Sequence, residues 1–190
     1  CLPDDAARET VALIARPHTR VIDASTAHRT SWTYGFPELT RTQRAAIAGA
    51  TRVANPGCYP TGFLALVRPL RERDLLAADA PLTVHAVSGY TGGGRTMIEA
   101  YERGRAAAFG AYGLTLAHKH VPEMQAHAQL ARPPLFAPAV GAYARGMLVH
   151  VPLHDAPSGA ELHAALAEHF AGEPLVAVRP LGEVDRHLEP

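Results

Sequence analysis

The chain has 190 residues, and 47% of them are hydrophobic. We therefore expect a globular protein of one large domain or two small ones. Its 18 Lys and Arg residues balance its 18 Asp and Glu residues. The balanced charge gives no basic stripe for nucleic acid, and no apolar run approaches the roughly 20 residues of a membrane helix. Two cysteines, Cys1 and Cys58, make no disulfide framework, which predicts a cytoplasmic protein.

The first part of the chain alternates short strands with helices. Asp4 is a candidate N-cap for the first helix, and Thr40 with Gln43 forms a capping-box pattern before the second. The predicted elements are, in order, a strand end at 1–2, a helix at 6–15, a strand at 21–23, a polar loop at 25–36, a helix at 44–50 and a strand at 52–54. This order predicts a parallel sheet with crossover helices.

The second part predicts a mixed sheet with helices on one side, an α+β layer. Ser158 and Glu161 form another capping box, which opens a helix with a face of apolar residues: Leu162, Ala165, Leu166 and Phe170. The other predicted elements are a helix after residue 58, a helix at 96–105 and strands at 82–87, 135–140, 147–153 and 175–178.

Residues 55–61, Asn-Pro-Gly-Cys-Tyr-Pro-Thr, place the thiol of Cys58 at the start of a predicted helix. Pro60 suits the first turn of that helix, and the apolar run 63–67 follows it. Unpaired N–H groups and the positive end of the helix dipole favour a thiolate, the nucleophilic form of cysteine. The alternative is a small buried cysteine without chemistry, and local sequence does not decide between the two.

His118 and His120 flank Lys119 just before Pro122. Proline holds the preceding residue extended, so we expect a loop or strand end on which both imidazoles share a face. A histidine near Cys58 would act as a base or as the imidazolium partner of the thiolate. The alternatives are a polar surface loop and a zinc site that includes Glu123. The tight ligand pairs of known zinc frameworks do not occur, so we predict no metal.

Two further stretches carry weaker signals. Residues 88–95, Ser-Gly-Tyr-Thr-Gly-Gly-Gly-Arg, would let a backbone approach a phosphate, although the pattern matches neither a P-loop nor Gly-x-Gly-x-x-Gly. A flexible loop is the alternative. Arg29 is a candidate clamp for a carboxylate, since guanidinium binds carboxylates through two hydrogen bonds, or else an ordinary surface arginine.

Taken together, five stretches of the chain resemble the shorter form of the N-acetyl-γ-glutamyl-phosphate reductase family. This family is related to the glyceraldehyde-phosphate and aspartate-semialdehyde dehydrogenases. Each stretch alone is a modest signal, but the set is specific and runs along nearly the whole chain. The stretches are residues 22–29, 34–39, 55–61, 88–95 and 118–124.

The resemblance implies an α/β fold of two parts. Residues 1–57 would be a partial Rossmann-type NADP domain, and residues 58–190 a mixed-sheet α+β catalytic and dimerisation domain of the glyceraldehyde-phosphate dehydrogenase type. The family's first βα unit, with its glycine-rich pyrophosphate turn, and its C-terminal continuation would both lie outside this sequence. Whether these residues alone bind NADP(H) is therefore open. A homo-oligomer, either dimer or tetramer, is also implied, with no nucleic-acid or membrane partner.

The resemblance also implies an activity: NADPH-dependent reduction of N-acetylglutamyl 5-phosphate to the semialdehyde, in arginine biosynthesis. Cys58 would form a thioester, with His118 as its acid/base partner, although which of the two histidines moves the proton is left open. The substrate would bind Arg29, Tyr112 and His120, and the cofactor would bind Leu2, Pro3, Ser88 and Gly89. The alternatives are a reductase of aspartyl phosphate or another acyl phosphate, a cysteine hydrolase or acyltransferase without a nicotinamide, and a non-catalytic fragment.

Overall fold

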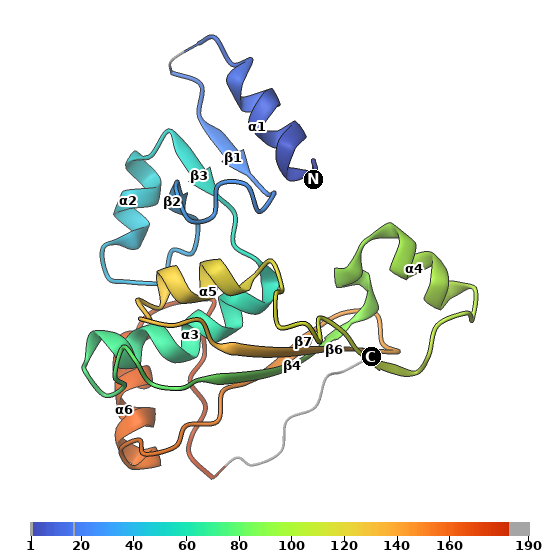
Figure 1. Cartoon of the computed structure of the whole chain (residues 1–190). Coiled ribbons are helices and arrows are strands. Elements are labelled where there is room, and N and C mark those ends of the chain that lie inside the picture. The colour runs from blue at the N-terminus through green and yellow to red at the C-terminus, as the bar shows by residue number, and fades with distance from the viewer. Residues whose placement is uncertain (1, 17, 183–190) are drawn as a thin grey trace.

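The computed structural model describes residues 2–16 and 18–182, which form two sheets and their helices (Figure 1). The predicted parallel sheet is confirmed in the first part of the chain. It consists of β1 (Val21–Asp23), β2 (Thr33–Tyr34) and β3 (Arg52–Ala54) in the order β1-β3-β2, with both pairings parallel. Helices α1 (Asp4–Ala12) and α2 (Gln43–Gly49) accompany it.

Several local predictions in this part are wrong. Leu2 belongs to no strand, and Cys1 lies outside the described residues. Asp4 is the first residue of α1 and caps nothing, because its carboxylate accepts hydrogen bonds from the backbone and hydroxyl of Thr26. The capping box before α2 does not form either, since the Gln43 amide donates to the carbonyl of Tyr34. β2 lies inside the predicted polar loop.

The second sheet has the order β5-β6-β4-β7 and is mixed, as predicted. β4 (Thr83–Gly89) pairs parallel with β6 (Leu135–Gly141), and the pairings of β5 (Phe109–Ala111) and β7 (Met147–His150) are antiparallel. β7 stops before Pro152, which has no N–H to donate. The predicted strand at 175–178 is wrong: these residues are irregular, and Leu175 is 87% exposed.

Helix α3 (Cys58–Glu72) organises the core of this second part. Its buried Phe63 and Leu64 join Val84 and Phe136 of the sheet in one apolar cluster. Helices α5 (Val121–His127) and α6 (Gly159–His169) pack against α3, and the predicted capping box of Ser158 and Glu161 opens α6. Among the described residues, no helix combines the length and apolar character required to cross a membrane.

Three chain segments reach one region between the sheets (Figure 1). β3 leads into α3 at Cys58, β4 leads into the short helix η1 (Tyr90–Gly93) and then α4 (Arg95–Glu102), and residues 118–120 lead into α5. The motifs at 55–61, 88–95 and 118–124 therefore meet in space, although they are far apart in sequence.

Candidate active site

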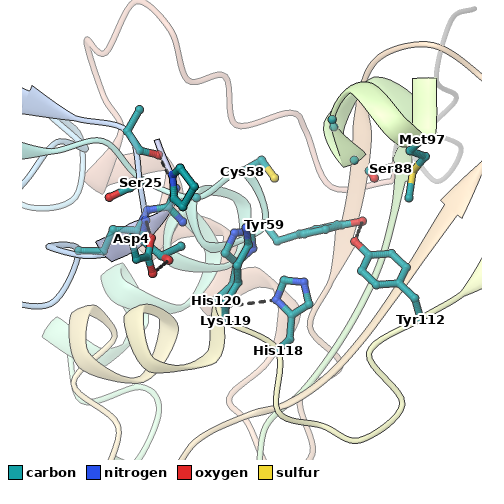
Figure 2. A pocket seen from close by; sticks show the side chains of 18 of the residues that line it. Asp4, Ser25, Cys58, Tyr59, Ser88, Met97, Tyr112, His118, Lys119 and His120 are labelled. Carbon is teal, nitrogen blue, oxygen red and sulfur yellow. Dashed lines mark hydrogen bonds between the residues drawn. The ribbon is translucent and has the colours of Figure 1, made fainter. Parts of the chain in front are cut away.

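A cavity of about 610 Å³ lies where these segments meet (Figure 2). Its size is within the range of small-molecule pockets. The predicted site residues that line it are Leu2, Pro3, Arg29, Cys58, Ser88, Tyr112, His118 and His120. Gly89 does not line it: a Cβ there would lie 2.7 Å from the Ala144 carbonyl, so Gly89 packs against the 143–146 turn. Three lining residues have no role in the sequence prediction of the site: Asp4, Thr26 and Met97. Glycines 92–94 belong to the 88–95 stretch, which the sequence marks as a weak signal for ligand contact.

Cys58 is the first residue of α3, and its side chain is exposed at the cavity. The preceding Gly57 is extended, and its carbonyl accepts the Thr61 N–H at 3.0 Å and the Thr61 hydroxyl at 2.9 Å. A nucleophile in this position faces the unpaired N–H groups of the first helical turn. The structure thus supplies the geometry that the 55–61 motif predicts, with Pro60 in the first turn.

Gly57 is required by close packing, not by the turn. A Cβ at this position would lie 2.6 Å from Glu123 Oε1, 2.7 Å from Arg29 Nη1 and 2.9 Å from His120 Nε2. These atoms cannot withdraw easily, because Arg29 and Glu123 form a buried ion pair. The backbone just before Cys58 is therefore pressed against charged and polar side chains from two distant segments.

Glu123 is the centre of this buried network, and its side chain is 1% exposed. Its carboxylate accepts hydrogen bonds from Arg29 Nη1 at 2.7 Å, Tyr34 Oη at 2.8 Å and the Gly57 N–H at 3.1 Å. Charge-assisted hydrogen bonds of this kind are stronger than neutral ones. The network joins the first sheet, the cysteine loop and α5.

Two sequence predictions bear on this network. The remaining nitrogens of Arg29 donate to the carbonyls of Asn55 and Ala24, so its guanidinium points into the protein even though the residue lines the cavity. The sequence offers Glu123 as a zinc ligand, but its carboxylate oxygens already accept the three hydrogen bonds described above. Within the described part of the chain, no group of three or more His, Cys, Asp or Glu side chains is placed to hold a metal ion.

The two histidines lie side by side, with ring centroids 4.7 Å apart, but not on an extended segment. Val121 before Pro122 is already helical, since proline is tolerated in the first turn of α5. Burial lowers the pKa of His120 to about 3, and electrostatic interactions with the neighbouring His118, Arg29 and Lys119 act in the same direction. His120 is therefore neutral near pH 7.

His118 is half-buried, and burial followed by the charge of Lys119 lowers its pKa. The backbone N–H of His120 donates to His118 Nδ1 at 3.2 Å. A nitrogen that accepts a hydrogen bond carries no proton, so the neutral imidazole of His118 has its proton on Nε2. His118 is thus set up as a donor through Nε2.

A family model described as "Semialdehyde dehydrogenase, dimerisation domain" matches residues 58–188. The whole chain is 55% identical over 200 residues to an N-acetyl-gamma-glutamyl-phosphate reductase of Chelativorans sp. (strain BNC1), and it covers 64% of that relative. The chain is also 54% identical over 200 residues to the reductase of Mesorhizobium japonicum. This match includes the whole of the chain and 65% of that relative. The chain therefore spans somewhat less than two thirds of these curated relatives.

Among solved structures, the fold is similar to that of aspartate semialdehyde dehydrogenase II from Vibrio cholerae. The TM-score is 0.65 at 15% sequence identity, and the match covers 88% of this chain and 58% of the other. At this identity the likeness establishes the fold alone. The predicted α/β architecture, a parallel sheet followed by a mixed sheet, is confirmed by this match and by the family model.

Proposed function

The chain belongs to the semialdehyde dehydrogenase family, and from this premise we propose that its cavity is the acyl-phosphate-reducing site of an N-acetyl-γ-glutamyl-phosphate reductase. The relatives that bear this name are 51 to 55% identical to it along the whole chain. The family model describes residues 58–188 as a dimerisation domain, so we also propose that the protein acts as a homo-oligomer.

The observation that carries the proposal is that the exposed thiol of Cys58, at the start of α3, and the imidazole of His118 line one cavity (Figure 2). Cys58 Sγ, as a thiolate, attacks the carbonyl carbon of the acyl phosphate. The bond between that carbon and the phosphate oxygen breaks, inorganic phosphate leaves with the electron pair, and a thioester to Cys58 remains. The N-terminus of α3 stabilises the thiolate before the attack.

We assign to His118, and not to His120, the hydrogen bond to the reacting oxygen. The neutral imidazole of His118 keeps its proton on Nε2 and from there can donate a hydrogen bond to the oxygen that gains charge during the attack. His120 is 7% exposed and has a pKa of about 3, so protonation during the reaction would be costly. Its Nε2 lies close to Gly57, and its side chain forms part of the cavity lining.

The described residues fit one end of a nicotinamide dinucleotide. Leu2, Met97 and the backbone of Gly92–94 give the cavity apolar and peptide surfaces suited to an uncharged aromatic ring. No Gly-x-Gly-x-x-Gly turn for the pyrophosphate occurs in this sequence. When bound, NADPH supplies the hydride that reduces the thioester. Of the chain's own residues, Cys58 would hold the acyl group, and Ser88 and Tyr112 line the same cavity.

A comparison of two substrates tests the function. The protein at its natural length is given N-acetylglutamyl phosphate or aspartyl phosphate, and NADPH consumption and phosphate release are followed together. We expect equal amounts of both products from the N-acetylated substrate, with kcat/KM at least about tenfold above that for aspartyl phosphate. Phosphate release without NADPH consumption would indicate a hydrolase, and a preference for aspartyl phosphate would contradict the proposed substrate.

A further inference from the structure

A chain of hydrogen bonds runs from the cavity into the second sheet through two tyrosines (Figure 2). Tyr59, the residue after Cys58, donates from Oη to the carbonyl of Ala139 on β6 at 3.0 Å. The oxygens of the Tyr112 and Tyr59 hydroxyls are 3.2 Å apart. Tyr59 is 2% exposed and packs edge-on against Phe136, so its ring is held firmly.

The direction of these hydrogen bonds is fixed by counting protons. A carbonyl oxygen only accepts, so the single hydroxyl proton of Tyr59 is committed to Ala139. The Tyr59 oxygen must then accept from Tyr112, which commits the proton of Tyr112 as well. Burial and the hydrogen bond to Tyr59 raise the pKa of Tyr112, so its hydroxyl keeps that proton. The Tyr112 oxygen can therefore only accept from a ligand in the cavity.

An obligate acceptor selects a ligand group with an N–H or O–H. Among the described residues that line the cavity, the one carboxylate, Asp4, already accepts two hydrogen bonds from Thr26, and Arg29 is paired with Glu123. Lys119 lines the same cavity, so the site suits a neutral donor such as an amide N–H better than an ammonium group. Ionised carboxylate oxygens offer no proton and gain nothing from this hydroxyl.

We propose that Tyr59 is a positioning residue that makes the Tyr112 hydroxyl an obligate hydrogen-bond acceptor, and that this acceptor binds the amide N–H of an N-acylated substrate. The inference rests on the proposed function and adds to it the group by which an N-acyl amino acid is recognised. Tyr59 acts through Tyr112, so its removal changes selectivity and KM more than kcat.

The test replaces the amide of the substrate by an ester. The reaction is run from the aldehyde side, with NADP and phosphate, on N-acetylglutamate semialdehyde and on its acetoxy analogue, in which oxygen replaces the N–H. In the wild-type protein we expect the ratio of kcat/KM for amide over ester to be about tenfold, as for the loss of one hydrogen bond. Tyr112→Phe should bring the ratio close to one. Tyr59→Phe should lower it as well, because the freed proton of Tyr112 can then turn toward the ester oxygen.

Tyr143→Phe is the matched control. The Tyr143 hydroxyl is buried without a hydrogen-bond partner and does not line the cavity, so its loss should leave the ratio unchanged. An active wild type with a ratio near one, or a wild-type ratio that persists in Tyr59→Phe and Tyr112→Phe, would overturn the inference and leave the proposed function standing. A wild type that forms no NADPH from the amide substrate would overturn both.

Discussion

One wall of the cavity is fixed by buried charge, whereas the wall formed by residues 92–94 is exposed and, among the described residues, holds no buried ion pair. On the first, Glu123 ties Arg29, Tyr34 and the Gly57 amide together behind Cys58. On the second, residues 92–94 are exposed glycines, and the side chain of the following Arg95 is 92% exposed and paired with its helical neighbour Glu99. The difference teaches that the groups proposed for chemistry are pre-organised, while the side that would admit ligands stays adaptable.

The largest effect should come from Cys58→Ser, which removes the proposed nucleophile from the fixed wall. Turnover should fall by at least about 10⁴-fold, the scale seen when a nucleophile is lost. The free energy of unfolding should stay within about 0.5 kcal/mol of the wild type, because the side chain is exposed. Steady-state rates measure the loss of turnover, and urea unfolding measures the stability. Wild-type-like turnover would contradict the role of Cys58 as the nucleophile.

His118→Ala tests the assignment of the hydrogen-bond donor to the reacting oxygen. We expect acylation to slow by about 10²–10³-fold, the usual cost of removing one such donor. His120→Ala should slow it much less, since His120 is buried and neutral. Single-turnover phosphate release measures the step. The reverse order of the two variants would show that the roles are exchanged.

Glu123→Gln measures how much the buried carboxylate of the fixed wall contributes to the stability of the protein. The substitution leaves the Arg29 guanidinium buried without its partner carboxylate, so unfolding free energy should fall by about 3 kcal/mol. Glu99→Gln is the matched control on the adaptable wall. Its pairs with Arg95 and Arg103 are at the surface, and its loss should cost less than about 1 kcal/mol. Equal losses in the two variants would contradict the contrast between the walls.

The smallest effect expected is a pH dependence of stability that arises from His120. Its pKa is about 3 in the folded protein and near the ordinary 6.5 in the unfolded chain, so between these values the imidazole is protonated only in the unfolded chain. The free energy of unfolding therefore has its full value above pH 6.5 and falls as the pH is lowered, by about 2 kcal/mol at pH 5. Urea unfolding at pH 8 and pH 5 measures it. His120→Asn should lose this part of the pH dependence, and an unchanged slope would contradict a buried neutral imidazole.

Local signals in the sequence predicted several elements of the fold, including those that lead to the cavity. The strands at Val21–Asp23 and Arg52–Ala54, the helix that begins at Cys58 and the Ser158 capping box all appear as expected. Each depends on residues close together in sequence, where propensity and capping chemistry act.

The parts that could not be predicted depend on long-range contacts. Glu123 lies 94 residues from Arg29 and 66 from Gly57, so no local pattern marks their network. The predicted capping box of Thr40 and Gln43 does not form for a similar reason, because the Gln43 side-chain amide donates a hydrogen bond to the Tyr34 carbonyl on β2. The proposed site residues were found through the family resemblance, which brought together motifs that local chemistry left ambiguous. The direction of the tyrosine hydrogen bonds could not be predicted either, because it depends on the contacts of Tyr59 with Ala139 and Tyr112, which are distant in sequence.

The most direct test of the central claim is the intact mass of the protein before and after brief exposure to N-acetylglutamyl phosphate without NADPH. With no hydride available, the thioester should accumulate, and we expect the mass to rise by one N-acetylglutamyl group that maps to Cys58. The Cys58→Ser variant should show no such thioester. An unmodified wild-type protein, or an adduct on another residue, would contradict the proposal that Cys58 is the nucleophile of an acyl-phosphate reductase.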